Sequence, residues 1–179
     1  MQAKNTAECN MKKYLTLLLL LPLASMAVHS QSIGVTVIAA PVGGSLSLDS
    51  YVWNIAFAND GVTSYLNDQQ SIMTIKSGTK KNFHVDFSSQ NLGYVKQGSN
   101  QIPYFLKATL ITSGYTGIVG TPPIIAGYVQ LTSTQTITFN KRTGGAGIQF
   151  SIGFQIPAYS EFYESGNYTD VLTISYAAP

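Results

Sequence analysis

The chain has 179 residues, of which 10% are charged, and its formal net charge is +2. A chain of this length accommodates one domain with a sizeable hydrophobic core. After Gln31 the seven basic residues are balanced by seven acidic ones, so the sequence offers no excess of positive charge for nucleic acid. A net charge near zero also lowers the barrier to self-association.

The N-terminal region carries an export signal. Met11 is followed by Lys12 and Lys13, and then by a short apolar run over residues 15–24. A positive segment, a short apolar segment and small residues at the end are typical of a bacterial-type secretory signal peptide, here over residues 11–30. The run is shorter than the roughly 20 apolar residues that cross a bilayer, so no membrane span is expected after cleavage.

Two cleavage points fit this signal. Ser25-Met26-Ala27 predicts cleavage after Ala27, and Val28-His29-Ser30 predicts cleavage before Gln31. Residues 1–10 are interpreted as an upstream extension, and Cys9, the one cysteine, falls within it. The exported part, residues 31–179, is therefore expected to be a single domain held by its core without a disulfide. Its expected location is the periplasm in transit, then the cell surface or an extracellular fibre.

Alternation of apolar and polar residues is the repeated pattern of the exported part. Such runs, rich in β-branched and aromatic residues, predict half-buried strands. The residues that share a face are Ile33, Val35 and Val37; Leu46 and Leu48, continued by 52–57; Ile72, Thr74 and Lys76, which alternate with Met73 and Ile75; Phe83, Val85 and Phe87; Leu106, Ala108 and Leu110; Ile148, Phe150, Ile152 and Phe154; and Leu172, Ile174 and Tyr176.

Turn formers separate these runs. They are Pro41-Val42-Gly43-Gly44, Asn59-Asp60-Gly61, Ser77-Gly78, Gly98-Ser99-Asn100, Gly120-Thr121-Pro122-Pro123 and Thr143-Gly144-Gly145. Short strands at this spacing predict an all-β fold, an antiparallel immunoglobulin-like β-sandwich of about seven to nine strands. A closed barrel is the alternative.

Residues for catalysis are scarce. His84 lies between Phe83 and Val85, which places it on the polar face of a strand rather than in a catalytic site. Glu161 and Glu164 fall in a loop rich in Tyr, Ser and Gly, which favours solvated carboxylates over a glycosidase pair. The glycine run 144–147 lacks the Lys-Ser/Thr of a phosphate loop. We therefore expect no enzyme, no metal site and no cofactor.

The two ends of the exported part are more informative. The segment 31–40 is an alternating apolar strand, Ile33, Val35, Val37 and Ala39 on one face, with little chain before it. At the other end, Leu172, Ile174 and Tyr176 form a last strand, for which we expect an uncovered outer edge. A mobile strand and an unpaired edge suit strand addition between subunits.

Three stretches, in order, resemble one family. Residues 166–176, Gly-Asn-Tyr-Thr-Asp-Val-Leu-Thr-Ile-Ser-Tyr, are similar to the C-terminal signature of spore-coat-protein-U-like domains, shared with pilins of the archaic (Csu-type) chaperone–usher pathway. Residues 101–106 and 153–158 resemble two further segments of that family. The matching positions are Pro103, Tyr104, Leu106, Gly153, Ile156, Pro157, Gly166, Tyr168 and Asp170.

This resemblance implies an incomplete sandwich that lacks one strand. A periplasmic chaperone would fill the gap first, and the N-terminal donor strand of the next subunit would replace it after passage through an outer-membrane usher. Ile33, Val35, Val37 and Ala39 would then belong to the donor strand, and Leu172, Ile174 and Tyr176 to the edge of the groove. The implied product is a head-to-tail fibre of identical or related subunits, of the kind that serves cell adhesion and biofilm formation.

One departure from the family is plain. Its members commonly carry a cysteine just after the donor strand, where this chain has Ala39-Ala40-Pro41. A second hypothesis also stays open, a self-contained secreted sandwich that binds a carbohydrate or a host surface. In that case residues 33–39 would fold back as an ordinary strand of their own domain.

Overall fold

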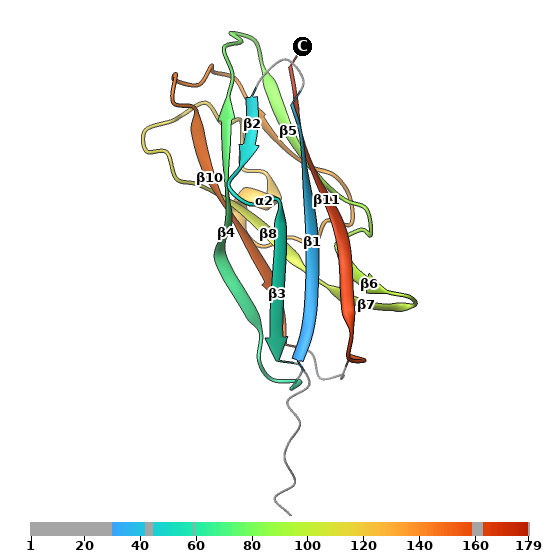
Figure 1. The fold of residues 1–179 in the computed structure, drawn as a ribbon. Helices are drawn as coiled ribbons and strands as arrows, with labels where there is room; N and C mark the ends of the chain where they lie inside the picture. Colours follow the sequence, from blue (N-terminus) through green and yellow to red (C-terminus); the bar gives the residue numbers. More distant parts are fainter. Residues whose placement is uncertain (1–29, 42–44, 59, 159–162, 179) are drawn as a thin grey trace, which may run out of the picture.

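A computed structural model describes residues 30–41, 45–58, 60–158 and 163–178 of the chain (Figure 1). The predicted signal peptide apart from Ser30 lies outside these residues, and so do the cleavage site after Ala27, Cys9 and His29. Glu161 also lies outside them. Within the described part, no helix is long and apolar enough to cross a membrane.

Nearly all regular structure consists of strands, as the alternating patterns predict. The elements are β1 (Ser30–Pro41), β2 (Ser45–Leu48), β3 (Val52–Ala58), β4 (Tyr65–Lys76), β5 (Phe83–Ser89), β6 (Tyr94–Gln97), β7 (Asn100–Pro103), β8 (Phe105–Leu110), the short helix α2 (Pro123–Ala126), β9 (Gln135–Phe139), β10 (Ile148–Ile156) and β11 (Asn167–Ala177).

These strands form two sheets that pack face to face. One is a seven-stranded sheet with the order β3-β1-β11-β5-β9, to which the β6–β7 hairpin adds through β11, and the other is a four-stranded sheet with the order β2-β4-β10-β8. The predicted all-β sandwich is confirmed, and the closed barrel does not form. The described residues hold eleven strands rather than seven to nine.

The additional strands have local causes. The short hairpin β6–β7 turns at Gly98, whose φ of +59° favours glycine. The apolar run 46–57 divides into β2 and β3, because the chain passes from one sheet to the other at Asp49. The carboxylate of Asp49 accepts hydrogen bonds from Ser71 Oγ (2.6 Å) and Ile72 N (2.8 Å), which holds this crossing against β4.

The core lies between the sheets and follows the predicted faces, except in β4, where Met73 and Ile75 are buried and Ile72 and Thr74 are not. Buried side chains alternate along β5 and β11. Strand β10 is buried almost throughout, because Ser151 Oγ donates to the carbonyl of Asp68 and Tyr128 covers Gly153. Rings fill the centre: Phe83 stacks on Phe139 with centroids 4.7 Å apart, and Phe139 meets Phe150 edge-on at 6.1 Å. A core of this kind holds the domain together by apolar burial.

Candidate functional site

The two ends of the described chain lie side by side. Strand β1 occupies the position between β3 and β11, visible in Figure 1 as the blue strand beside the red one. It pairs with β3 antiparallel and with β11 parallel. All other pairs among the named strands are antiparallel, so the β1–β11 pair is the exception to the predicted antiparallel sandwich.

The predicted donor-strand face points into the core. Ile33, Val35 and Val37 are at most 2% exposed, and Ala39 is half-buried against the same core. On the β3 side, Val35 pairs with Trp53 and Ile33 with Ile55. Sequence reasoning assigned no role to Trp53 and Ile55, although their alternation in the run 52–57 signals an inward face.

The predicted groove-edge residues lie along the other side of β1. Val37 pairs with Leu172, Ala39 with Ile174 and Pro41 with Tyr176 in the register of the two strands. Leu172, Ile174 and Tyr176 are at most 1% exposed. The structure therefore brings the two predicted sets together, within one chain.

The expectation of an uncovered edge on the last strand is wrong. Strand β11 is flanked by β1 on one side and by β5 on the other, with Tyr176 opposite Val85. The physical reason is that an apolar strand at the other end of the same chain fills the vacant edge. Sequence alternation gives a strand and its buried face, but it does not say which edge the strand joins.

Burial gives the β1 position a large share of the stability. Full burial of three branched side chains of this size contributes about 5–9 kcal/mol as an upper estimate. The net stability of a whole domain is only about 5–15 kcal/mol. An empty position beside β11 would therefore remove a large part of that stability.

The three family-like segments meet around Tyr104. Its hydroxyl donates a hydrogen bond of 2.6 Å to Asp170 Oδ2, which lies in the C-terminal segment. Its ring stacks on Phe154, from the third segment, with centroids 5.0 Å apart and an interplanar angle of 16°. Phe154 in turn meets Trp53 edge-on at 6.0 Å, so this cluster adjoins the wall of the β1 position.

Asp170 is a buried carboxylate with a full set of donors. Besides Tyr104, it accepts hydrogen bonds from Ser89 Oγ (2.6 Å) and from the backbone N–H of Asn91 (3.0 Å). Burial, followed by the negative charge and hydrogen bond of Asp170, raises the pKa of Tyr104 well above its ordinary value. Both hydrogen-bonding partners from the 89–91 turn were missed by sequence reasoning, because their role depends on a contact with a distant strand.

The other matching positions are structural. Pro103, Leu106 and Ile156 are buried, and Pro157 is half-buried just after β10. Gly153 sits at the register shift of β10, where a Cβ would collide with the hydroxyl of Tyr128.

Gly166 and Tyr168 stand where β1 and β11 begin. The carbonyl of Gly166 accepts a hydrogen bond from Ser32 N (3.4 Å), and a Cβ at Gly166 would collide with the side chain of Gln97. The hydroxyl of Tyr168 donates to the carbonyl of Glu164 (2.8 Å). This segment therefore joins the start of β1 to the start of β11.

The residues considered for catalysis do not converge. His84 lies on β5 with its Nε2 3.4 Å from Asp86 Oδ2, and its side chain is 44% exposed. Glu164 is exposed and accepts a hydrogen bond from Asn100 Nδ2 at 2.7 Å. Within the described ranges, no three His, Cys, Asp or Glu residues gather as a metal site would require.

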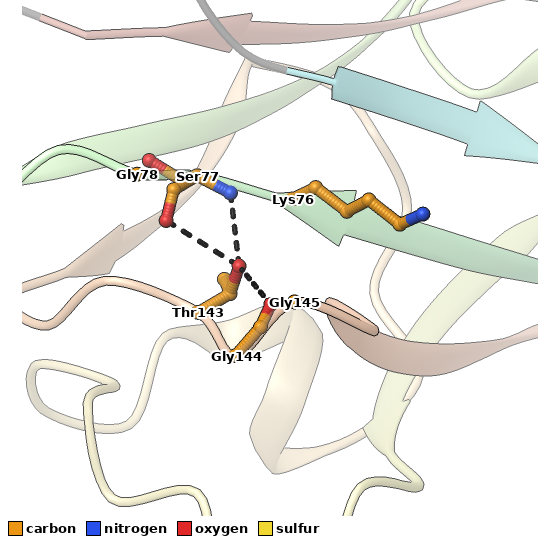
Figure 2. A pocket seen from close by; sticks show the side chains of 6 residues that line it. All are labelled: Lys76, Ser77, Gly78, Thr143, Gly144 and Gly145. Carbon is orange, nitrogen blue, oxygen red and sulfur yellow. Dashed lines mark hydrogen bonds between the residues drawn. The ribbon is translucent and has the colours of Figure 1, made fainter.

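A pocket of about 230 Å³ lies at the end of β4, lined by Lys76, Ser77, Gly78, Thr143, Gly144 and Gly145 (Figure 2). Polar atoms of Ser77, Thr143 and Gly144 in its wall bind one another. Thr143 Oγ1 accepts from Ser77 N (2.9 Å), and Thr143 N donates to the carbonyl of Ser77 (2.9 Å). A strand, β10, follows the glycine run, so the helix of a phosphate loop is not there. These hydrogen bonds fasten the loop at 143–145 to the end of β4.

Compared with known proteins, the chain matches no family model, and no curated protein matches it.

Proposed function

We propose that this chain is a structural, pilin-like subunit of a cell-surface fibre, exported and then assembled by donor-strand exchange through a chaperone–usher system. The observation that carries the proposal is the place of β1. Strand β1 lies beside β11 and turns three apolar residues into the core.

The attachment of β1 supports its exchange. Its C-terminal end continues into 42–44 and β2, so the strand can leave its position without drawing another strand through the sheet. Its pairing with β11 is parallel, which is slightly less stable per residue than antiparallel pairing. A strand from a neighbouring copy that enters in the opposite direction would pair antiparallel with β11 and parallel with β3.

A second candidate is favoured by the same pairing. Because β1 completes the sandwich of its own chain, the domain can also stand alone. It would then be a self-contained secreted adhesin that binds a carbohydrate or a host surface through its loops.

One experiment separates the two candidates. The exported protein is followed by size-exclusion chromatography with light scattering, with and without a synthetic peptide of residues 31–41. Concentration-dependent ladders that the peptide caps support the fibre subunit. A peptide with Val35→Asp is the inactive control, and one with Thr36→Asp is the active control, because Val35 faces the core and Thr36 faces solvent. A stable monomer indifferent to all three peptides contradicts the proposal and favours the adhesin.

A further inference from the structure

Five strands of the described residues stand at the margins of the sheets, and four of them are short or covered. Strands β2 and β7 have only four residues each. Strand β8 is covered by Val129, which exchanges two hydrogen bonds of 2.9 Å with Leu106. Strand β9 is covered by Val119, whose N–H donates to the carbonyl of Thr138 at 2.9 Å. These margins offer little to another strand.

The half of β4 that extends beyond β2 is occupied in another way. Gln69 N donates to Asn67 Oδ1 at 3.0 Å, and the carbonyl of Asp68 accepts a hydrogen bond from Ser151 Oγ. Asp68 also places a charge on this stretch. Side chains of the domain and a carboxylate therefore stand in the way of a further strand here.

Strand β3 is the margin that stays open. It has seven residues, and among the described strands it pairs only with β1, on the side of the sheet away from β11 (Figure 1). Residues 52–58 contain no charged side chain and no proline, which are the usual means of keeping an edge strand from pairing. The nearest charges, Asp49 and Asp60, lie outside the strand and bind groups of their own chain.

The ladder between β1 and β3 fixes which backbone groups of β3 face the open side. Val37 N donates to the carbonyl of Tyr51 at 2.8 Å, which continues the register of the two strands. Bonded and non-bonded pairs alternate along an antiparallel ladder. Trp53, Ile55 and Phe57 therefore direct their N–H and C=O groups to β1. The residues between and beside them direct theirs to the open side; they are Val52, Asn54, Ala56 and Ala58.

From this edge we propose that β3 of one copy pairs antiparallel with β3 of a second copy, about a two-fold axis at Ile55. In this register Val52 lies opposite Ala58 and Asn54 lies opposite Ala56. Each outward N–H group then meets an outward carbonyl of the other copy. The contact is isologous and closes at two copies, whose larger sheets become one continuous sheet.

A second copy is the occupant that the strand itself selects. The register centred on Ile55 leaves none of the four outward residues without a partner, so β3 is its own complement. Val52, an apolar side chain that is 56% exposed, is covered by the small Ala58 of the other copy. The absence of charge in residues 52–58 means that two identical strands approach without repulsion.

This contact differs from strand exchange and does not depend on it. A β1 from the same chain or from a neighbour takes the other side of β3, so the open edge is the same in both cases. The pairing buries main chain and few large side chains, so it belongs with the weak interfaces below ~1,200 Å², with a Kd on the order of 100 µM. Along a fibre the contact recurs at every subunit, and the weak pairs add up to side-by-side association of fibres.

Removal of one outward N–H group tests the pairing. Ala56→Pro deletes an N–H that faces away from β1, a place where an edge strand tolerates proline. Ala56→Ser keeps the N–H and is the matched control. Sedimentation velocity of the exported protein from about 10 to about 500 µM brackets the expected Kd. The unchanged protein and Ala56→Ser should form dimers, and Ala56→Pro should raise the Kd about tenfold or more, because two symmetry-related hydrogen bonds are lost. Equal association of the two variants would overturn the inference.

A second variant keeps every N–H group, so it tests the pairing even where proline disturbs the fold. Asn54→Lys/Ala56→Lys places lysine opposite lysine across the axis, which should abolish dimers at low salt concentration. Thr132→Lys/Thr134→Lys adds the same charge to exposed positions before β9 and should leave dimers unchanged. Urea denaturation at low protein concentration establishes that both variants are folded. Undiminished dimers in the first variant would contradict the pairing.

Cross-linking tests the register. Residues 31–179 contain no cysteine, so Asn54→Cys and Ala56→Cys each introduce a single thiol. Opposite residues of a bonded pair lie about 5.5 Å apart at Cα, within reach of a disulfide, whereas diagonal neighbours lie about 7–8 Å apart. Under mild oxidation, the mixture of the two variants should cross-link about tenfold faster than either alone. Equal rates would rule out the register centred on Ile55.

The two proposals fail in different ways. Pairing through β3 stops at two copies, whereas strand exchange continues into ladders. Ladders without dimers, indifferent to Ala56→Pro and to the lysines, would reject the pairing and keep strand exchange. Dimers that both variants abolish, without ladders, would keep the pairing and reject strand exchange.

Discussion

Tyr104 and Asp170, 66 residues apart in sequence, share a buried hydrogen bond of 2.6 Å. The bond joins the residue that precedes β8 to the first half of β11, and the stacking of Tyr104 on Phe154 adds β10 to the same cluster. Three separate segments of chain thus depend on one phenol. The cluster lies next to Trp53, which forms part of the wall against which β1 packs.

Replacing Tyr104 with phenylalanine keeps the ring stack and removes the hydroxyl donor. Asp170 then retains Ser89 and Asn91 but loses one partner in a buried site. We expect the free energy of unfolding to fall by about 1–3 kcal/mol in urea denaturation. Tyr94→Phe is the matched control, since no hydrogen bond of its hydroxyl occurs among the described residues. Equal losses in the two variants would remove any special role of Tyr104.

The same phenol makes stability depend on alkaline pH. The folded-state pKa of Tyr104 is raised above the ordinary value of 10.0, first by burial and then by Asp170. The unfolded chain therefore loses this proton at a lower pH than the folded chain. The stabilisation is complete below pH 10 and declines as pH rises beyond that value.

Urea denaturation of the wild type and Tyr104→Phe between pH 8 and about 11 measures this contribution. Other tyrosines and lysines titrate in both proteins, so the difference between the two slopes isolates Tyr104. We expect the wild type to have the steeper decline above pH 10. Parallel curves would show that Tyr104 releases its proton equally in both states.

The two faces of β1 are expected to respond differently to truncation. Val35 is fully buried opposite Trp53, so Val35→Ala leaves a cavity and should cost about 1–3 kcal/mol. Thr36, the next residue, is exposed, and Thr36→Ala should change the free energy of unfolding by less than about 0.5 kcal/mol. Thermal and urea unfolding of both variants measure the difference. A larger loss at Thr36 would reverse the assignment of the faces.

A disulfide between β1 and β11 is expected to hold the domain in its self-completed form. Thr36 pairs with Val171 in the parallel register, and both side chains lie on the solvent side of the sheet. Cysteines at both positions fall within the span that a disulfide bridges. The oxidised Thr36→Cys/Val171→Cys variant should remain monomeric by light scattering, and a reductant should restore any ladders. Ladders under oxidising conditions, with the bond formed within each chain, would contradict exchange of β1.

The local sequence was sufficient to predict a strand where its alternation of apolar and polar residues does not depend on the neighbouring strands. Phe83, Val85 and Phe87 alternate with polar residues, so β5 and its buried face follow from period-two burial alone. The short strands β6 and β9 were missed, because four or five residues give too little alternation to stand out from a turn-rich stretch. The division of 46–57 into β2 and β3 depends on Asp49 meeting Ser71 and Ile72, a contact between strands.

The sequence alone determined an all-β chain, the inward faces of most of the strands that it predicts and the apolar character of the first and last of them, because these depend on residue spacing. Tertiary structure decided which edges meet. It placed β1 beside β11 in parallel and joined Tyr104 to Asp170. Pairing partners and buried hydrogen bonds of this kind depend on contacts between residues far apart in the chain, and no local periodicity encodes them.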